Sequence, residues 1–480
     1  MAGAVTVSHD QWSSRFAFLM AAVGSSVGLG NLWRFSAEAG QNGGGAFIMI
    51  YLSCVLLIGI PVLMSEYIIG RAGNANSAIR SVNDIADHSG VGRKWSLLAW
   101  IGMIASFLIV SFYCVVAAWV IIYIPKFLMG AFEGQTAIQI SAQFGAAREN
   151  IWGLSPANLG VMWAFTAFAA LTAWLVARGV NQGIEWAAKV LMPMFFFLLF
   201  ALSIYSLWSG FSTRIPDASG APSNGAVEAL KFLFMADFSK VTPEVITRAL
   251  AQAFFSIGLG SAIMITYGSY LPKSINIPKS AIIVGLTDTG VALMAGLAIF
   301  PIVFAHGLDV NSGAGLFFET LPVALSSAPG GNLIGAAFFF LAIFAAVTSS
   351  ISLLEPVVAW VIEKFQVSRK TAAIGMGLLM WVMGLGSIFI DGFMGMLDGK
   401  LTGAIMLPLA GLLTVLFVGW RMNKSMVDEQ MADASPLLRA VLFNLVRYVA
   451  PVFVFAVLVL GIDHSYFNDV LGNLLGIAAG

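Results

Sequence analysis

Hydrophobic residues recur along this chain in long runs that are separated by mostly short polar connections. Eleven runs approach or exceed the roughly 20 apolar residues that an α-helix needs to cross a bilayer. They cover residues 13–38, 44–70, 95–125, 158–177, 183–209, 246–270, 279–305, 333–362, 371–390, 401–420 and 437–461. Only the connections 126–157, 210–245 and 306–332 are long, and they hold polar, Gly- and Pro-rich sequence. The pattern predicts an all-α polytopic membrane protein with about 11 transmembrane helices.

Composition agrees with this class, because 59% of the 480 residues are hydrophobic and only 10% are charged. The formal net charge is zero, so the chain lacks the basic footprint of a nucleic-acid-binding protein. Cys54 and Cys114 both lie in apolar runs, which favours buried free thiols over a disulfide or metal pair. The first dozen residues lack a signal-peptide pattern, so we expect the first run to remain as a span.

Lysine and arginine residues are distributed unevenly between the two sides that these runs connect. Placing the N-terminus in the cytoplasm puts most of the 24 basic residues on the cytoplasmic side. Basic residues are retained on that side during insertion. We therefore expect a cytoplasmic N-terminus, an extracytoplasmic C-terminus after eleven spans, and all three long connections outside.

The first run contains a stretch, residues 22–35, that is poorly suited to a continuous helix. Each of three glycines there destabilises a helix by roughly 1 kcal/mol relative to alanine. The polar residues Asn31 and Arg34 also lie in this run. Non-helical backbone at membrane depth is tolerated only where protein or a water-filled cavity surrounds it. Gly24 and Gly28 also fit a small-residue face for helix packing, which is the alternative interpretation.

A second interruption, at residues 254–261, follows five runs later and again combines glycines with hydroxyls. Because five is odd, two five-span units must insert with opposite orientation. Interrupted helices at matching positions of inverted repeats are typical of secondary transporters with a binding site at the midplane. The pattern predicts one transporter domain over 1–480, with repeats at about 13–209 and 246–420 and an extra helix at about 437–461.

Short motifs in several runs narrow this class further. They are Val27-Gly28-Leu29-Gly30-Asn31 with Trp33-Arg34-Phe35, Asn42-Gly43-Gly44-Gly45-Ala46-Phe47, Gly59-Ile60-Pro61 with Glu66, Gln252 to Tyr267, Thr348-Ser349-Ser350, and Gly183 and Pro193 separated by nine residues. Over about 10–462 the chain resembles the neurotransmitter:sodium symporter family and its bacterial amino-acid transporters in particular. The resemblance implies the leucine-transporter fold, with helices 1 and 6 unwound at the midplane, in a bacterial inner membrane.

This resemblance also implies two sodium sites, and sodium, like other hard cations, takes oxygen ligands. The residues implied for site 1, together with the substrate carboxylate, are Ser26, Asn31, Ser256 and Asp288. Those implied for site 2 are Gly24, Val27, Ala345, Thr348 and Ser349. For Thr348 and Ser349 the alternative is ordinary interhelical hydrogen bonding.

Asp288 is a carboxylate well inside the apolar run 279–305. Intramembrane ionisable residues cost about 2.5–3.5 kcal/mol on insertion scales and are functional by default. Many members of the family that the chain resembles have an amide here, and in chloride-dependent members a bound chloride supplies the negative charge. Our hypothesis is that Asp288 binds sodium and makes transport independent of chloride; the alternative is a protonated aspartate bonded to a neighbouring helix.

Four residues resemble the family's outer gate. Arg34 and Asp398 match its charged pair, and Tyr113 and Phe255 match the lid over the substrate. An ion pair suits a gate because the free-energy cost of removing its charges from water depends on whether water reaches it. The alternative is a permanent structural ion pair.

On the cytoplasmic side the family usually pairs an Arg before the first Trp with an Asp after span 8. This chain has His9 and Glu363 in that region, so an inner gate of these two residues is a hypothesis. We expect Glu66 and Glu355 to cap or bridge broken backbone.

The resemblance implies a substrate pocket on both interrupted helices and on spans 3 and 8. Its residues are Ser25, Ser26, Gly28, Leu29, Gly30, Ile109, Tyr113, Phe255, Ser256, Gly258, Ser261, Ser349 and Leu353. A leucine-selective relative has Ser and Phe where this chain has Gly258 and Ser261, and losing the Phe enlarges the pocket. We therefore predict symport of a hydrophobic L-amino acid, bulky and preferably aromatic, with sodium and no organic cofactor.

Three other functions fit part of this pattern. A sodium-coupled carrier of another carboxylated solute, such as an osmolyte, is the nearest alternative, and a channel or non-transporting sensor belongs to a different class. An enzyme is the weakest, because the sequence offers no nucleophile–base pair. The oligomeric state and the preferred amino acid are left open.

Overall fold

The computed structural model describes residues 11–149, 151–155, 158–216, 220–310, 315–467 and 470. In these residues the chain is almost entirely helical, and two antiparallel strand pairs lie in the connections. β1 (Leu154–Ser155) pairs with β2 (Asn158–Leu159), and β3 (Arg214–Pro216) pairs with β4 (Pro222–Asn224). The prediction of an all-α fold is confirmed.

Eight helical runs in the described part are long and apolar enough to cross a membrane. They are Gly45–Gly73, Arg93–Leu128, Val180–Ser212, Ile277–Ala305, Gly331–Phe365, Arg369–Phe389, Phe393–Arg421 and Pro436–Tyr466. A ninth span is the pair Arg15–Ser26 and Gly30–Gln41, whose two halves meet at 53°. The remaining two predicted runs contain shorter helices, so their crossing of the membrane stays a prediction.

The individual helices follow these bounds along the chain. Those in the predicted runs are α1 (Arg15–Ser26), η1 (Gly30–Arg34), α2 (Phe35–Gln41), α3 (Gly45–Cys54), η2 (Val55–Gly59), α4 (Ile60–Gly73), η3 (Arg93–Ser96), α6 (Leu97–Leu128), α8 (Val161–Ala177), η4 (Val180–Glu185), α9 (Trp186–Ser212), α11 (Pro243–Ser256), α12 (Ile263–Ser269), α13 (Ile277–Ala305), α15 (Gly331–Phe365), α16 (Arg369–Phe389), α17 (Phe393–Gly395), η7 (Met396–Met406), α18 (Leu407–Leu416), η8 (Phe417–Arg421), α20 (Pro436–Asn444), η9 (Leu445–Val449) and α21 (Ala450–Tyr466). Those in the connections are α5 (Ala78–His88), α7 (Ala137–Glu149), α10 (Gly225–Phe234), η5 (Phe238–Lys240), η6 (Leu316–Thr320), α14 (Leu321–Ser327) and α19 (Lys424–Gln430).

One predicted boundary is wrong. The run predicted to begin at 401 begins at Phe393, so Asp398 and Lys400 lie inside the helical run and not before it. Hydropathy predicts that a membrane span ends at such polar residues. In the folded chain, however, both side chains line a cavity that can accommodate them.

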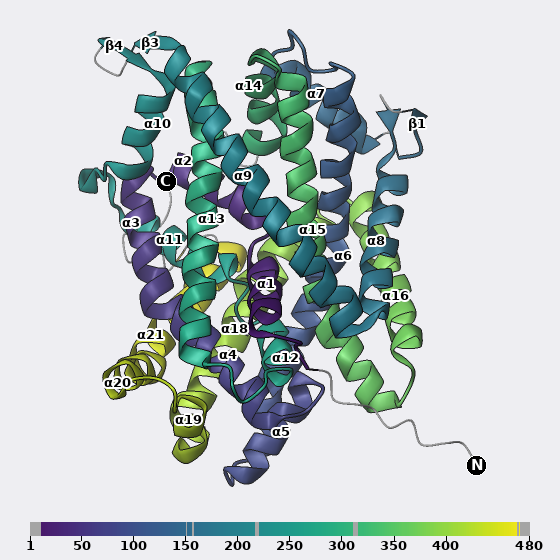
Figure 1. Cartoon of the computed structure of the whole chain (residues 1–480), viewed down its shortest axis with the longest axis vertical. Helices are drawn as coiled ribbons and strands as arrows, with labels where there is room; N and C mark the ends of the chain where they lie inside the picture. The colour runs from purple at the N-terminus through teal and green to yellow at the C-terminus, as the bar shows by residue number, and fades with distance from the viewer. Residues whose placement is uncertain are drawn as a thin grey trace.

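The connections separate into two ends of the bundle (Figure 1). α7, α10, α14 and the two strand pairs lie at the top, whereas α5 and α19 lie at the bottom. The three long connections therefore share one end, as the distribution of basic residues requires.

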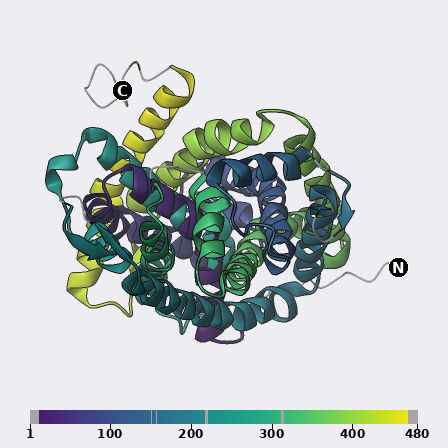
Figure 2. The same cartoon turned by 90° about the horizontal axis from the view of Figure 1, so that it is seen from above.

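The two interrupted helices lie near the middle of the bundle. Seen from above, the longer helices surround this centre (Figure 2), and α1 and α12 are close to it in Figure 1. α15 is the most enclosed of the long helices, with 83% of its most apolar stretch buried, against 28% for α16 at the periphery. α15 packs along α6, and α13 packs along α9. This arrangement places the breaks of both helices against the polar residues of α13 and α15.

Candidate functional site

The first span breaks where its glycines occur. α1 ends at Ser26, and Val27 adopts extended backbone with φ −74° and ψ 98°. Helix resumes as η1 at Gly30. Helix ends leave carbonyls on one side and N–H groups on the other without intrahelical partners. The break therefore exposes backbone carbonyls and amides to the middle of the bundle.

The sixth span breaks in a similar way between α11 and α12. Gly258, Gly260 and Ala262 have positive φ angles of 72°, 76° and 60°. Glycine adopts this conformation without steric cost, and at Gly260 a Cβ would lie 2.2 Å from the carbonyl oxygen of Leu407. The Gly260 N–H donates to the Glu66 carboxylate at 2.7 Å, so this acid satisfies one amide of the break.

Residues of α13 and both breaks form the first polar cluster, which contains Asn31, Ser256 and Asp288. The Asn31 amide donates to Oδ1 of Asp288 at 2.8 Å and to the Ser256 hydroxyl at 3.2 Å. The Ser256 hydroxyl donates to Oδ2 of Asp288 at 2.7 Å. Asn31 and Asp288 are fully buried. The cluster combines oxygen ligands with one formal negative charge, which is the chemistry that a hard monovalent cation requires.

Two further residues complete the surroundings of this cluster. The Tyr51 hydroxyl of α3 lies 3.5 Å from Oδ2 of Asp288 and 3.4 Å from the Ser256 hydroxyl. The Ser26 hydroxyl lies 3.3 Å from the carbonyl oxygen of Ile257, so it bridges the two breaks. Sequence reasoning missed Tyr51, although a phenol in an otherwise apolar run was a signal that could have identified it.

The second cluster joins α1 to α15. The Ser349 hydroxyl lies 3.3, 3.4 and 3.5 Å from the carbonyl oxygens of Gly24, Ser25 and Val27. The neighbouring Thr348 hydroxyl lies 3.2 Å from the carbonyl oxygen of Ala345. A Cβ at Gly24 would lie 3.0 Å from Cβ of Thr348, so the helices approach closely. The five residues implied for sodium site 2 therefore lie together.

The backbone of the first break contacts side chains of the implied substrate pocket beside these clusters. The Leu29 N–H donates to the Tyr113 hydroxyl at 3.3 Å. A Cβ at Gly28 would lie 2.9 Å from the Ser349 hydroxyl, and one at Gly30 would lie 3.8 Å from the Phe255 ring. The pocket thus borders directly on the second cluster, and side chains larger than glycine at these positions would narrow it.

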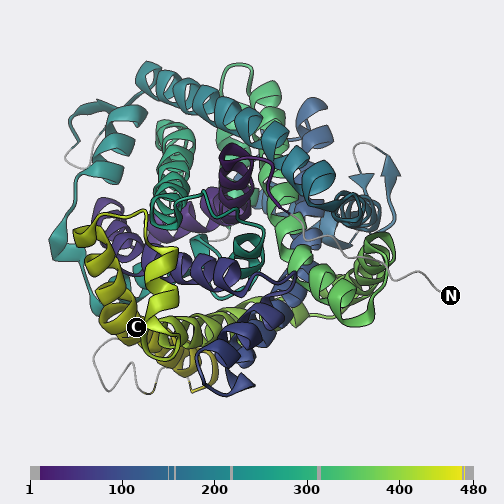
Figure 3. The ribbon, with the colours of Figure 1, turned by 60° about the horizontal axis from the view of Figure 1, so that its bottom comes forward.

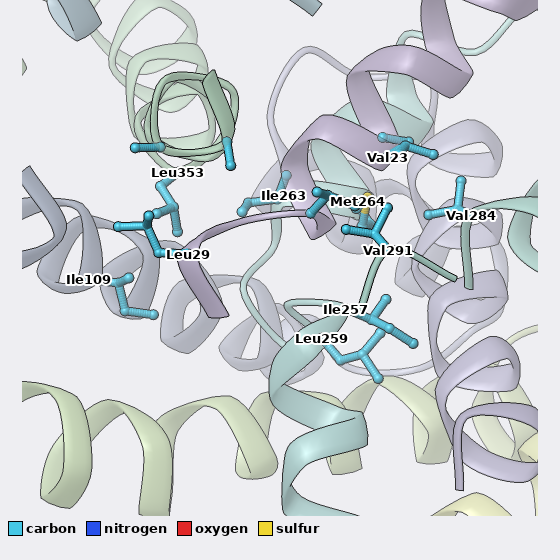
Figure 4. Packing of buried hydrophobic residues seen from close by; sticks show 14 of the residues in the cluster. Val23, Leu29, Ile109, Ile257, Leu259, Ile263, Met264, Val284, Val291 and Leu353 are labelled. Carbon is cyan, nitrogen blue, oxygen red and sulfur yellow. The ribbon is translucent and has the colours of Figure 1, made fainter. Parts of the chain in front are cut away.

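The apolar wall of this region comes from three helices. Figure 4 shows Leu29, Ile109 and Leu353 close together at the break in the first span. In the second break, Gly258 has no heavy atom within 4 Å of where a Cβ would lie. The Ser261 hydroxyl donates to the Gly258 carbonyl at 2.6 Å, so here it supports the break.

A cavity of about 600 Å³ opens on the other side of Phe255 and is lined by Arg34, Phe255, Asp398 and residues of α11 and α21. The Arg34 guanidinium lies 4.1 Å from the centre of the Phe255 ring. Arg34 and Asp398 face the same cavity, but in the described part of the chain they make no ion pair within 4 Å. In this conformation the Arg34 side chain lies against the Phe255 ring.

The opposite side is closed by the first described residues. Trp12 is buried, and its indole N–H donates to the Tyr267 carbonyl at 3.0 Å. Ser13 donates to the Glu185 carboxylate from its N–H, at 3.0 Å, and from its hydroxyl. Lys189 pairs with the same carboxylate at 2.6 Å. Sequence reasoning missed Glu185, although it lies two residues after Gly183 of the Gly–Pro motif.

The acids that were considered for the cytoplasmic side have other partners. Glu363 accepts from the Ser77 N–H at 2.9 Å and lies 3.9 Å from Arg80. Its hypothetical gate partner His9 lies outside the described residues. Glu355 accepts from the Tyr270 hydroxyl at 2.8 Å and pairs with Arg369 of α16.

Comparison with protein families identifies one match over nearly the whole chain. Residues 9–136 and 154–469 match the model of the sodium:neurotransmitter symporter family. An uncharacterized sodium-dependent transporter of Bacillus subtilis, YhdH, is 37% identical over 92% of this chain and 95% of its own length. Another from Haemophilus influenzae is 30% identical over 94% of this chain and 98% of its own length.

The arrangement of helices is also that of a solved transporter. A crystal structure of MhsT in complex with L-phenylalanine superposes with a TM-score of 0.80 at 36% identity. The match covers 94% of this chain and 99% of the solved one.

Proposed function

The chain belongs to the sodium:neurotransmitter symporter family, and from this we propose that it carries a hydrophobic L-amino acid into the cell together with sodium, by alternating access. It is a sodium-dependent, multi-pass membrane transporter and not an enzyme. The family and the leucine-transporter fold predicted from the sequence are confirmed. The single observation that carries the rest of the proposal is the buried contact of Asn31 and Ser256 with the Asp288 carboxylate at the two breaks.

The two polar clusters would each take one sodium ion. The first supplies a carboxylate and neutral oxygens, and the second supplies the Ser349 hydroxyl facing three backbone carbonyls. Moving two positive charges inward is driven by about 2.3 kcal/mol per charge per 100 mV. This gives about 4.6 kcal/mol, or roughly three decades of accumulation, before any sodium gradient is added.

The Asp288 carboxylate would also remove the need for chloride. Its two oxygens accept hydrogen bonds from Asn31 and Ser256, and the Tyr51 hydroxyl lies 3.5 Å away. A fixed negative charge in this position balances the cation that binds beside it. Transport is therefore expected to proceed when chloride is replaced by a larger anion.

The space beside Gly258 supports a bulky substrate. No heavy atom lies within 4 Å of a Cβ built there. Ile109 and Leu353 form an apolar surface beside Leu29 at the break of the first span (Figure 4). The solved relative MhsT was crystallised with L-phenylalanine. We propose that the side chain of an aromatic L-amino acid occupies this space while its carboxylate meets the Leu29 and Gly30 amides and the Tyr113 hydroxyl.

The two sides of the site differ in access, as alternating access requires. The outer cavity reaches Phe255, whereas Trp12 and the Ser13–Glu185 contact close the opposite side. We propose that the closed side faces the cytoplasm of a bacterial cell, with the N-terminus inside. Arg34 would exchange the Phe255 ring for Asp398 as the outer side closes.

The test is uptake into proteoliposomes that carry an inward sodium gradient. Labelled L-phenylalanine, L-tryptophan, L-leucine and glycine are compared, and chloride is replaced by gluconate in a parallel series. We expect saturable, sodium-dependent uptake of the aromatic amino acids that gluconate leaves unchanged. Loss of uptake in gluconate would refute chloride independence.

Competition by all twenty amino acids and by glycine betaine distinguishes the remaining alternative. Displacement by betaine and not by amino acids would assign the site to an osmolyte. Displacement led by L-tryptophan and L-phenylalanine supports the proposed substrate class.

A further inference from the structure

A group of basic residues marks the part of the chain that joins the last two spans. They are Arg421, Lys424, Arg439 and Arg447, and we call them the basic corner. Within the described residues, none of the four makes an ion pair with an acid within 4 Å. One acid of the same connection, Glu429, lies 3.9 Å from Lys273. The corner therefore keeps uncompensated positive charge.

Arg447 is held in place by the preceding span. A Cβ at Gly419 would lie 3.0 Å from Cα of Arg447, so the two helices touch at this point. The Trp420 indole N–H donates to the Arg447 carbonyl at 2.9 Å. The guanidinium lies 4.5 Å from the centre of the Trp420 ring and 5.5 Å from that of Tyr448. Cation–π contact with two rings fixes the side chain without neutralising it.

Two donors of the basic corner have no partner. The Nε atoms of Arg447 and Arg439 are buried and make no hydrogen bond to any described residue. A buried donor without a partner costs about 1–3 kcal/mol. Neither guanidinium is therefore fully satisfied by contacts within the described residues.

The surroundings of the basic corner have the layered character of a membrane interface. Trp420 and Tyr448 are 52% and 55% exposed. Tryptophan and tyrosine side chains are enriched at the level of the lipid head groups. Further along α21, Val452 and Phe455 are exposed and apolar. The helices that carry the corner lie at the same end of the molecule as α5 and α19 in Figure 1, and Figure 3 turns this end toward the viewer. Cation, aromatic and apolar surfaces thus follow one another along the lipid-facing side.

We propose that the basic corner binds the phosphate of an anionic glycerophospholipid. Arg447 and Arg421 face the head group, Trp420 and Tyr448 flank the glycerol region, and one acyl chain follows Val452 and Phe455. Basic pockets at the cytoplasmic ends of membrane helices bind anionic head groups in this way. A lipid bound here bridges the last two spans, which contact each other through Gly419 and Arg447.

The experiment measures lipid binding to the delipidated full-length protein by native mass spectrometry. Phosphatidylglycerol is titrated against phosphatidylcholine with the same acyl chains. We expect preferential binding of phosphatidylglycerol, weakened about 30-fold in the double variant Arg421→Gln and Arg447→Gln. This follows from roughly 1 kcal/mol per basic residue near the surface and 1.4 kcal/mol per tenfold change.

Two further variants separate charge at this corner from other effects. Lys370→Gln removes an exposed cation near the start of α16, a helix on the opposite side of the bundle from α19 and α20 (Figure 1). This variant should leave binding within twofold of the original. Arg421→Lys with Arg447→Lys keeps the charge and should keep most of the preference. Equal melting temperatures in lipid-free detergent establish that the variants are folded.

Two results would overturn the proposal. One is unchanged phosphatidylglycerol binding in the folded glutamine variant, which would place the lipid elsewhere. The other is displacement of the lipid by equimolar inorganic phosphate or glycerol 3-phosphate, which would identify a site for a soluble anion.

Discussion

Replacing Asp288 with asparagine removes the formal charge from the cluster at the two breaks. Both carboxylate oxygens accept hydrogen bonds, one from the Asn31 amide at 2.8 Å and one from the Ser256 hydroxyl at 2.7 Å. Asparagine keeps one oxygen and turns an NH₂ group toward the other donor. The variant therefore loses a charge-assisted hydrogen bond as well as the charge.

The expected size of the effect follows from the lost charge, because the contacts with Asn31 and Ser256 exist without sodium and contribute equally to the sodium-free protein. A carboxylate attracts a cation 4 Å away by about 4 kcal/mol at an effective dielectric constant near 20. The amide oxygen of asparagine retains part of this attraction, so sodium affinity should fall by up to about three decades, at about 1.4 kcal/mol per decade.

The assay is equilibrium binding of labelled L-phenylalanine to purified protein as sodium is titrated, because detergent removes the membrane potential. Asp288→Asn should raise the sodium concentration for half-maximal binding by the factor above. Asp391→Asn, an exposed acid in the turn before α17, is the control and should leave it unchanged. A shift below twofold in folded Asp288→Asn protein would refute the assignment of Asp288 as a sodium ligand.

Two further changes test the pocket and its closed side. Gly28→Ala places a Cβ 2.9 Å from the Ser349 hydroxyl and 3.2 Å from the Tyr113 hydroxyl. Overpacking of this kind costs about 1–3 kcal/mol. The dissociation constant for L-phenylalanine should therefore rise about 5- to 150-fold in the binding assay. Glu185→Gln removes the charge that holds Ser13, and hydrogen exchange at residues 12–20 should accelerate about tenfold or more, from the loss of about 1.5–3 kcal/mol.

Each of these has a matched control. Gly290→Ala adds a methyl group on α13 where no heavy atom lies within 4 Å, so binding should not change. Glu244→Gln removes an acid at the outer end of α11 and should leave exchange at the N-terminal segment as it was. Equal effects of a variant and its control would contradict the local explanation.

The sequence by itself determined the helices, the places where two of them break, and the family. Apolar runs and clustered glycines act through local backbone preferences, which need no knowledge of the partner segments. Asp288 was identifiable for the same reason, since an acid within an apolar run is unusual wherever its neighbours lie.

Only the tertiary structure decided which side chains meet. Asn31 contacts Ser256 across 225 positions of sequence, and Ser349 faces the Gly24 carbonyl across 325. The apolar run around Tyr51 marks its phenol as unusual, but only the packing of α3 against α11 and α13 shows that this hydroxyl joins the first cluster. The hydropathy pattern also placed the start of one span at 401, because hydropathy contains no information about the cavity that Asp398 lines.

The contacts at the closed side of the site, around Ser13 and Glu185, could not be predicted from the sequence of either segment alone. Glu185 holds Ser13, and Glu363 lies beside Arg80, although spacing along the chain suggests neither pair. Such contacts depend on the directions in which packed helices turn their side chains. Hydropathy and backbone propensity are properties of one segment, whereas a cation site requires oxygens from several segments at once, and only packing brings them together.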